Sequence, residues 1–378
     1  MVIKNILNYL LTRFVSKPVI NYFNTGFEKR VLISYITKPF KEGIDSSHSN
    51  RVEVLIIADV FNKLGYNVDI YDFYSKKKVN YSDYNLVFGI GDLYENSLRN
   101  KNLNINYIYY ATGAYFEFQN TAEMSRIIQL YKRTGTLLKP VRFIKTPRYL
   151  ATQLSDAIIT TGNEWTVSTY IYSNMPFYKV PVSVFNIFEV NFIRNISIAK
   201  TKFIWLGSHG LVHKGLDLCI EAFKAFPNFE LHIFGTNEKK FLDIYKNELK
   251  QTNIIYHGFV DVLGNKFKEV AKTCMFSVYP SCSEGQSGSL LTTMSMGLIP
   301  IATLSSGVDL INKGFVINGE IEDIKKRIKE VVEMNDKDLE KLSLNNIKFI
   351  DENHRINNFE KKFEKNLNII LKNNGRKN

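Results

Sequence analysis

Residues 279–303 read YPSCSEGQSGSLLTTMSMGLIPIAT, and this stretch decides the fold of the chain. The apolar run that leads into it predicts a buried strand, which ends at the proline because proline cannot donate a ladder hydrogen bond. Residues 281–288 include five serine or glycine residues, which is typical of a loop. The next apolar positions predict a helix that Ser287 or Ser289 caps and Gly297 ends. The sequence IPIAT then begins a second strand.

A glycine- and serine-rich loop before a helix presents free backbone N–H groups and the positive end of the helix dipole. Such an end suits a pyrophosphate. Glu284 in this loop cannot hold a phosphate, because like charges repel, but its carboxylate can accept hydrogen bonds from the hydroxyls of an attached sugar. A plain connector with a solvated Glu284 is the competing interpretation.

The same stretch resembles the donor site of the family-four glycosyltransferases, enzymes of the GT-B fold. Their pattern is P-S-x-x-E-G, a helix with a second glutamate, and then A-x-G-x-P-V-V-A-T. The matching residues here are Pro280, Ser281, Glu284, Gly285, Met294, Gly297, Pro300, Ala302 and Thr303. The family's second glutamate falls at Thr292, so a ribose contact at that position would be weaker here.

A second motif, GSHGLVHKGLDLCIEAFKAF, begins at Gly207 and resembles the family pattern G-R-x-x-x-x-K-G-x-D-x-x-x-E-A-F. Lys214 precedes a helix and would bring a positive charge close to the expected pyrophosphate. The family's arginine is absent, and Ser208 and His209 stand in its place, so His209 is the candidate replacement. Taken alone, Lys214 would be a solvated surface lysine.

The resemblance implies an α/β protein of the GT-B fold. We expect two Rossmann-like domains whose parallel sheets face each other across a cleft, with a C-terminal helix that crosses back onto the first domain. The expected divisions are a basic amphipathic segment (1–30), an acceptor-side domain (31–190), a nucleotide-sugar-binding domain (191–350), and a final helix and tail (351–378). The expected buried face of that helix consists of Phe359, Phe363, Leu367 and Ile370.

The resemblance also implies a set of donor-binding residues, in which the ends of two further strands border the nucleotide base through backbone groups. The expected donor-binding residues are Gly207, Ser208, His209, Lys214, Gly235, Gly258, Phe259, Val260, Glu284, Gly285, Gln286, Ser287, Gly288, Ser289 and Thr292.

The first domain provides the acceptor candidates. A strand–loop–helix–strand order at its start predicts a parallel α/β unit. His48 lies in that loop, where it could contact a phosphate or a sugar hydroxyl, or simply cap the helix. Residues 113–120, GAYFEFQN, read as a loop of aromatic rings and Glu117 suited to a sugar, or as aromatic packing, before a basic helix at 122–134. The acceptor candidates are His48, Gly113, Glu117 and Asn163.

Composition narrows the choice of partners. The 378 residues carry a formal net charge of +12, which favours anionic partners, and three cysteines form no metal spacing. Residues 1–30 have apolar side chains at helical spacing and a local charge of +4, so they either lie on an anionic membrane surface or pack on the first domain. No signal peptide or membrane span is predicted. We expect a cytoplasmic protein, with association at the inner face of the membrane left open.

These observations lead to one main hypothesis. We expect a retaining glycosyltransferase that moves a sugar from a nucleotide-diphosphate donor to a glycan or lipid-linked glycan acceptor of the surface-polysaccharide or lipopolysaccharide type. Its expected catalytic residues are Glu284, Lys214 and His48. The absence of a D-x-D motif in the right context predicts no metal requirement, and no cofactor is expected beyond the sugar nucleotide as co-substrate.

Two other functions compete with this hypothesis. One is a non-catalytic GT-B protein that binds a nucleotide sugar or serves as a scaffold, favoured by the missing arginine and second glutamate. The other is an NAD-dependent Rossmann enzyme, which the incomplete glycine fingerprint disfavours. Nucleic-acid binding would rest on net charge alone and is not expected.

Overall fold

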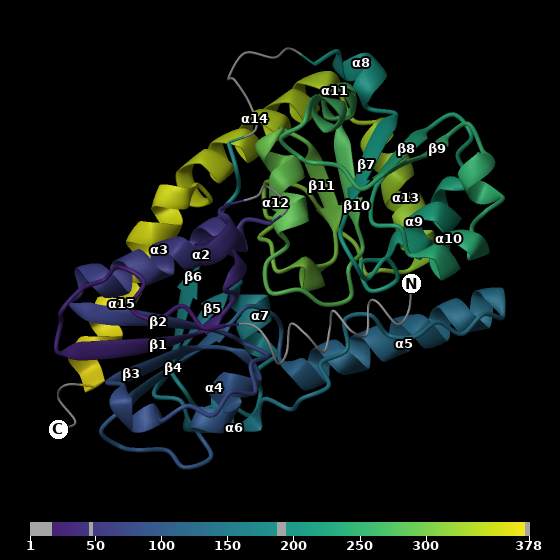
Figure 1. Ribbon diagram of the computed structural model, residues 1–378. Coiled ribbons are helices and arrows are strands. Elements are labelled where there is room, and N and C mark those ends of the chain that lie inside the picture. Colours follow the sequence, from purple (N-terminus) through teal and green to yellow (C-terminus); the bar gives the residue numbers. More distant parts are fainter. Residues whose placement is uncertain (1–16, 45–47, 187–193, 375–378) are drawn as a thin grey trace.

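The computed structural model describes residues 17–44, 48–186 and 194–374. The apolar pattern expected in the first fifteen residues therefore lies outside the described residues. The chain forms two α/β domains, each built around a six-stranded sheet whose neighbouring strands all pair in parallel (Figure 1).

The first sheet consists of β1 (Lys29–Tyr35), β2 (Tyr66–Asp72), β3 (Leu86–Gly89), β4 (Asn106–Ala111), β5 (Ala157–Thr161) and β6 (Phe177–Val180). Its order is β2-β1-β3-β4-β5-β6. The second sheet consists of β7 (Lys202–Leu206), β8 (Glu230–Phe234), β9 (Ile254–Gly258), β10 (Phe276–Tyr279), β11 (Ile299–Ala302) and β12 (Phe315–Val316). Its order is β12-β11-β10-β7-β8-β9.

Helices cover both faces of each sheet, as crossovers between parallel strands require. The first domain contributes α2 (Lys38–Glu42), α3 (Asn50–Lys63), α4 (Gly91–Ser97), α5 (Phe116–Thr134), α6 (Tyr149–Leu154) and α7 (Glu164–Ser168). The remaining helices are α8 (Ile196–Ala199), α9 (Leu216–Phe223), α10 (Lys239–Ile244), α11 (Asn265–Thr273), α12 (Gly288–Ser295), α13 (Ile321–Val332), α14 (Asp336–Asn353) and α15 (Ile356–Asn374).

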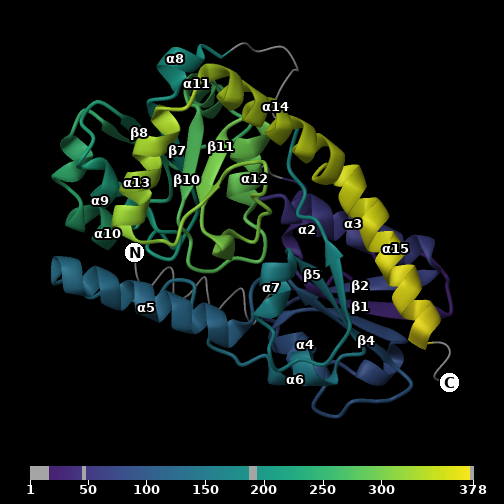
Figure 2. The ribbon, with the colours of Figure 1, turned by 180° about the vertical axis from the view of Figure 1, so that it is seen from behind.

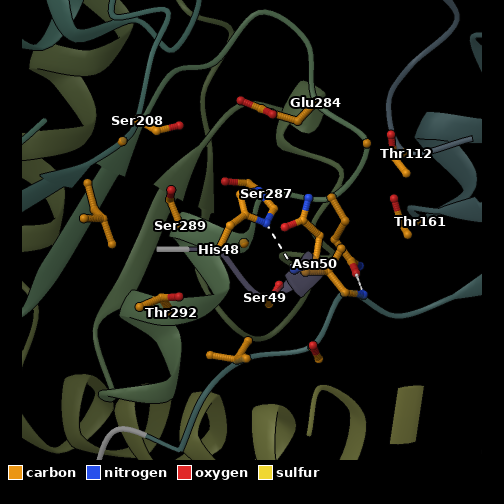
Figure 3. A pocket seen from close by; sticks show the side chains of 18 of the residues that line it. His48, Ser49, Asn50, Thr112, Thr161, Ser208, Glu284, Ser287, Ser289 and Thr292 are labelled. Atoms are coloured by element: carbon orange, nitrogen blue, oxygen red, sulfur yellow. Dashed lines mark hydrogen bonds between the residues drawn. The ribbon is translucent and has the colours of Figure 1, made fainter. Parts of the chain in front are cut away.

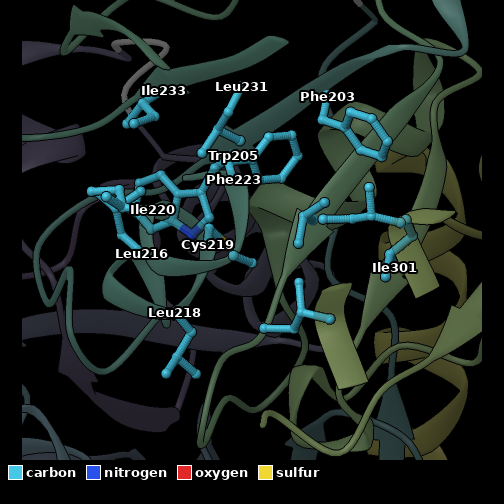
Figure 4. Close-up of a cluster of buried hydrophobic side chains, with 14 of the residues drawn as sticks. Phe203, Trp205, Leu216, Leu218, Cys219, Ile220, Phe223, Leu231, Ile233 and Ile301 are labelled. Atoms are coloured by element: carbon cyan, nitrogen blue, oxygen red, sulfur yellow. The ribbon is translucent and has the colours of Figure 1, made fainter. Parts of the chain in front are cut away.

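Alternation along the central strands divides each core into two layers. In β7, Phe203 and Trp205 pack on one face of the sheet with α9 and α13, while Ile204 packs on the other with α11. Figure 4 shows the first of these layers around Trp205. This alternation follows from the two-residue repeat of a strand, and burial on both faces explains why the strands read as continuous apolar runs.

The expected GT-B architecture is confirmed, including the returning C-terminal helix. Helix α15 lies along the first domain, far from the strands that precede it in sequence (Figure 2). Its four expected apolar residues all join the core beneath β1 and β3, and Phe363 makes edge contacts with Phe61 and Phe88. The last helix therefore ties the end of the chain to the domain that begins it.

Helix α5 differs from the sequence prediction. Residues 113–120 were expected as a loop, but the helix begins at Phe116, within that segment. The aromatic rings explain the difference: Tyr115 and Phe116 are buried in the first domain's core, where Phe116 contacts Tyr149 edge-on at 5.0 Å between ring centroids. Packing of these rings starts the helix six residues earlier than expected.

Helix α5 also leaves its own domain. It projects beneath the second domain in both views (Figures 1 and 2), and its Ile127 and Leu130 belong to that domain's core cluster. Arg126 donates to the carbonyl oxygen of Pro280 at 2.9 Å, and Arg133 pairs with the buried Asp217. The helix thus connects the first domain to the segment of the second domain that carries Glu284.

No helix in the described ranges is both long enough and apolar enough to span a membrane.

The packing of α15 generates a stability prediction. Phe363→Ala should lower the free energy of unfolding by about 3–5 kcal/mol, because a fully buried ring is removed and a cavity remains. Lys362→Ala, on the exposed side of the same helix, is the control and should change the free energy by less than about 0.5 kcal/mol. Urea unfolding followed by circular dichroism measures both, and equal midpoints would contradict the packing described.

Candidate active site

A cavity of about 200 Å³ lies between the two domains and is lined by residues of both. The carboxyl ends of β4 and β5 border it from the first domain, and the segments after β7 and β10 border it from the second. Parallel α/β sheets place ligand sites at this edge. The cavity therefore occupies the position at which the fold brings loops from both sheets together.

The loop after β10 sits directly against the first domain. A Cβ atom at Gly285 would lie 2.6 Å from the carbonyl oxygen of Thr112 and 2.8 Å from that of Thr161, so only glycine allows this approach. Thr166 also donates its hydroxyl hydrogen to the carbonyl oxygen of Gly285. Thr112 and Thr161 appear beside the loop in Figure 3. The loop after β10 is thereby held against the first domain.

Helix α12 points its amino end into the cavity. Ser287 caps it by accepting from the Leu290 N–H at 3.3 Å, and Gly288 and Ser289 line the cavity. The first N–H groups of a helix have no partner within it. The cap therefore leaves N–H groups of the first turn at the cavity wall, where an anion is favoured.

Glu284 and Lys214 form a buried ion pair at the base of this loop. The Lys214 ammonium donates to Glu284 Oε1 at 2.6 Å and to the Tyr279 hydroxyl at 2.8 Å. The hydroxyls of Tyr279 and Ser281 donate to the same oxygen at 3.0 and 3.2 Å. Within the described residues Oε2 accepts no hydrogen bond, so it is the oxygen of this carboxylate left for a ligand.

The charges around Glu284 keep it ionised. Burial alone would raise the pKa of its carboxyl group, but the charges of Lys214 and Arg142 lower that pKa to about 2. A buried carboxylate with one satisfied and one free oxygen can accept hydrogen bonds from hydroxyl groups without reorganising.

His213, next to Lys214 in the chain, is a neutral support for the loop. Its Nε2 lies against the carbonyl oxygen of Ser283 and its Nδ1 is buried without a partner among the described residues. Burial lowers the pKa of His213 to about 4, although Glu284 acts in the opposite direction. The imidazole therefore serves as a hydrogen-bond donor that fixes the loop and adds no charge at neutral pH.

His48 approaches from the first domain. The residue is exposed as a whole, yet its ring points into the cleft beside Ser287 (Figure 3). There desolvation, followed by the charges of Lys214 and Arg142, lowers its pKa to about 4. The Asn50 N–H donates to Nδ1 at 3.2 Å, so Nε2 carries the proton of the neutral ring and is available as a donor.

Most of the expected donor-binding residues line this cavity. These are Gly207, Ser208, Lys214, Phe259, Val260, Glu284, Gly285, Gln286, Ser287, Gly288, Ser289 and Thr292. Of the acceptor candidates, His48 lines it as well. The structure thus brings together the two motifs that are about 70 residues apart in sequence.

Three expected donor contacts lie outside the cavity lining. His209 is exposed and lies outside the cavity lining. Gly235 packs under the Trp205 ring, and its N–H donates to the carbonyl oxygen of Gly258 at 3.1 Å. Phe234 and Phe259, one position away, line the cavity in place of these glycines.

Three expected acceptor contacts have structural partners instead. The carbonyl oxygen of Gly113 accepts from the Tyr170 hydroxyl at 2.7 Å. Glu117 lies on the first turn of α5 and accepts from the Tyr149 hydroxyl. Asn163 caps α7 and donates to Asp309 at 2.8 Å. All three lie outside the cavity lining. The early start of α5 places Glu117 on a helix, whereas Asn163 is held by its cap of α7 and by Asp309.

Two charged residues at the cavity were missed from the sequence. Glu53 is buried, accepts from the Ser183 N–H and hydroxyl at 2.7 Å each, and has a pKa raised by burial. Glu53 lies at helical spacing from the buried Ile57 and Phe61 on α3, and this spacing could have indicated that Glu53 faces inward. Arg142 lies in an irregular segment between α5 and α6, where no pattern marked it.

The buried histidines generate a pH prediction. Burial lowers the pKa of both His213 and His354 from 6.5 to about 4. Between these values the unfolded chain binds protons that the folded protein does not, so stability is retained above pH 6.5 and lost as the pH falls towards 4. Urea unfolding at pH 7, 6 and 5 should show a shallower pH dependence for His354→Gln. His209→Gln, at an exposed site, should keep the wild-type slope, and identical slopes for both variants would contradict the assignment.

A family model matches most of the second domain. Residues 200–334 match the family model described as "Glycosyl transferases group 1". None of the curated protein sequences matches the chain. The family match covers the strands from β7 to β12 and both motifs around Lys214 and Glu284.

Solved structures show the fold of the whole chain. Sucrose-phosphate synthase from Thermosynechococcus elongatus aligns with a TM-score of 0.63 at 11% identity, over 91% of this chain and 99% of its own. Anabaena HepE, in complex with UDP and glucose, has a TM-score of 0.58 at 11% identity, with 90% and 99% covered. WaaG, a glycosyltransferase involved in lipopolysaccharide biosynthesis, has a TM-score of 0.55 at 14% identity, with 90% and 99% covered.

A longer protein is also similar. TarM from S. aureus, in a complex that includes UDP, has a TM-score of 0.54 at 15% identity, and the match covers 76% of this chain but 55% of TarM, so this chain spans about half of that protein. The fold implied by the resemblance is confirmed: the chain has the GT-B fold, and residues 200–334 match the glycosyl transferases group 1 model.

Proposed function

We propose that this protein is a retaining glycosyltransferase that transfers a sugar from a nucleotide-diphosphate donor to an acceptor of the surface-polysaccharide or lipopolysaccharide type. The observation that carries the proposal is the buried Glu284–Lys214 pair beside the amino end of α12, in a cavity between two GT-B domains. The pair and the helix end offer one oxygen for sugar hydroxyls and several N–H groups for a diphosphate within one small space.

The roles of the site residues follow from their chemistry. The N–H groups at the start of α12 would bind the diphosphate and stabilise the charge that develops on it as it leaves. Glu284 Oε2 would accept hydrogen bonds from the transferred sugar. The Lys214 ammonium has three N–H groups, of which two are used by Glu284 and Tyr279, so the third remains for a phosphate oxygen. The Nε2–H group of His48 would donate a hydrogen bond to a phosphate oxygen or to a hydroxyl of the sugar.

The proposed reaction proceeds on one face of the sugar. A bond forms between an acceptor hydroxyl oxygen and the anomeric carbon as the bond from that carbon to the phosphate oxygen breaks. The acceptor proton passes to the leaving phosphate, so the configuration is retained without a second carboxylate as base. Thr292 in place of a second glutamate is compatible with this step, and no metal ion takes part in it.

Comparison and geometry support the donor and acceptor classes. HepE was solved with UDP and glucose, and WaaG acts in lipopolysaccharide biosynthesis.

The cavity of about 200 Å³ is smaller than the roughly 300–1,000 Å³ of most ligand pockets. We infer that the domains part to admit the donor and close to exclude water from the transfer step.

A non-catalytic nucleotide-sugar-binding protein is the second candidate, favoured by Thr292 at the position of the second glutamate. A panel of nucleotide sugars separates the two. Transfer or slow hydrolysis of a donor that binds would support the enzyme, and tight binding with no turnover of any donor would support the second candidate.

Glu284→Gln tests the role assigned to the carboxylate. The amide keeps the shape of the side chain but loses the charge that orients sugar hydroxyls, so kcat should fall more than tenfold. Affinity for the free nucleoside diphosphate should stay the same or rise, because Lys214 is released. Glu322→Gln, on the exposed face of α13, is the matched control. Unchanged kcat in the Glu284 variant would remove the carboxylate from the mechanism.

Lys214→Met tests the ion pair. Removing one partner leaves a buried charge unpaired, which should cost about 3–5 kcal/mol of stability and weaken donor binding strongly. The double variant Lys214→Met/Glu284→Gln should regain most of that stability but remain inactive. Thermal unfolding and donor titration measure the two effects, and full additivity of the single-variant stabilities would show that the residues are not coupled.

A further inference from the structure

The side chains at the cavity wall carry too little positive charge to neutralise a bound diphosphate. The charged side chains that line it are Glu53, Arg142, Lys214 and Glu284. Lys214 and Glu284 neutralise each other at 2.6 Å. His48 and His213 are neutral at neutral pH. Arg142 is therefore the remaining cation, and in the described part of the chain no carboxylate lies within ion-pair distance of its guanidinium.

Hydrogen bonds from the first domain hold the backbone of Arg142 in position. Its backbone N–H donates to Glu123 Oε1 at 2.7 Å, and its carbonyl oxygen accepts from Gln119 Nε2 at 2.6 Å. Both of these side chains come from α5. Because α5 is anchored to the second domain by Ile127 and by the bond from Arg126 to Pro280, Arg142 is fixed relative to the Glu284 loop.

The side chain then lies over the other donor motif. A Cβ atom at Gly210 would be 2.6 Å from Arg142 Cγ, so the aliphatic stem crosses the β7–α9 loop where only glycine leaves room. Its Nε is buried without a hydrogen-bond partner among the residues described. A buried, unsatisfied guanidinium nitrogen at a cavity wall is costly unless a ligand or water completes it.

We propose that Arg142 binds the diphosphate of the donor, so that a residue of the first domain completes a site otherwise built by the second. This inference rests on the proposed function. A diphosphate held by α12, Lys214 and Arg142 would then contact residues of both domains. A guanidinium can bridge two phosphate oxygens in a way that the lysine cannot.

Isothermal titration calorimetry tests the proposal with UDP, GDP and ADP and with their nucleosides as probes. Arg142→Met keeps the stem over Gly210 but removes the charge. We expect it to weaken binding of the preferred nucleoside diphosphate about ten- to hundredfold, as loss of a charge-assisted hydrogen bond does, with nucleoside affinity unchanged. Arg142→Lys should recover part of the loss. Lys145→Ala, at an exposed position in the same segment, is the matched control and should bind like wild type.

The outcomes separate this inference from the proposed function. If wild type binds a nucleoside diphosphate and Arg142→Met binds it equally well, the inference is overturned and the proposed function stands. An equal loss of nucleoside and diphosphate affinity would assign Arg142 a structural role and also overturn it. If wild type binds none of the nucleoside diphosphates, both fall. A thermal midpoint within about 2 °C of wild type confirms that the variant is folded.

Discussion

The buried pairing of Glu284 with Lys214 is the interaction on which the site depends. A carboxylate and an ammonium withdrawn from water are tolerated only when each is closely paired and hydrogen-bonded. Here Tyr279 and Ser281 supply the additional bonds, and His213 fixes the loop without adding charge. The arrangement keeps an ionised carboxylate at a site where burial alone would protonate it, with one oxygen directed away from the pair.

The pairing has a second consequence, because a neutralised lysine contributes less to binding an anion. In the proposed reaction, the diphosphate would therefore depend on the amino end of α12 and on a cation from outside the second domain. Helix α5 makes that cation available: it begins in the first domain's core, crosses to the second domain, and holds the segment that carries Arg142. The two domains are thus coupled through a helix as well as through the chain connections and the returning α15.

Much of this could be predicted from the sequence, for identifiable reasons. The strand–loop–helix unit around Glu284 and the motif at Lys214 carry their chemistry in local order, so both could be predicted to face one ligand, and both line the cavity. The apolar spacing of α15 is equally local. The body of helix α5 was predicted, but its start was not, because aromatic residues near Phe116 are compatible with a loop until the core that buries them is known.

The missed and misplaced site residues share a cause. Arg142 reaches the cavity only through side chains of α5 and the close approach at Gly210, and neither leaves a local pattern. Gly235 follows β8 and Gly258 ends β9, but Gly235 packs under Trp205, and the neighbouring Phe234 and Phe259 line the cavity instead. Sequence order identifies the loops of such a site, whereas the side chains that line it depend on contacts between distant elements.

A crystal structure of the protein with a nucleotide-diphosphate sugar that it binds tests the central claim most directly. The account predicts the diphosphate at the N–H groups of Gly288 and Ser289, with the sugar hydroxyls on Glu284 Oε2 and the Lys214 pair intact. A nucleotide bound elsewhere, or a diphosphate that leaves the start of α12 empty, would contradict it.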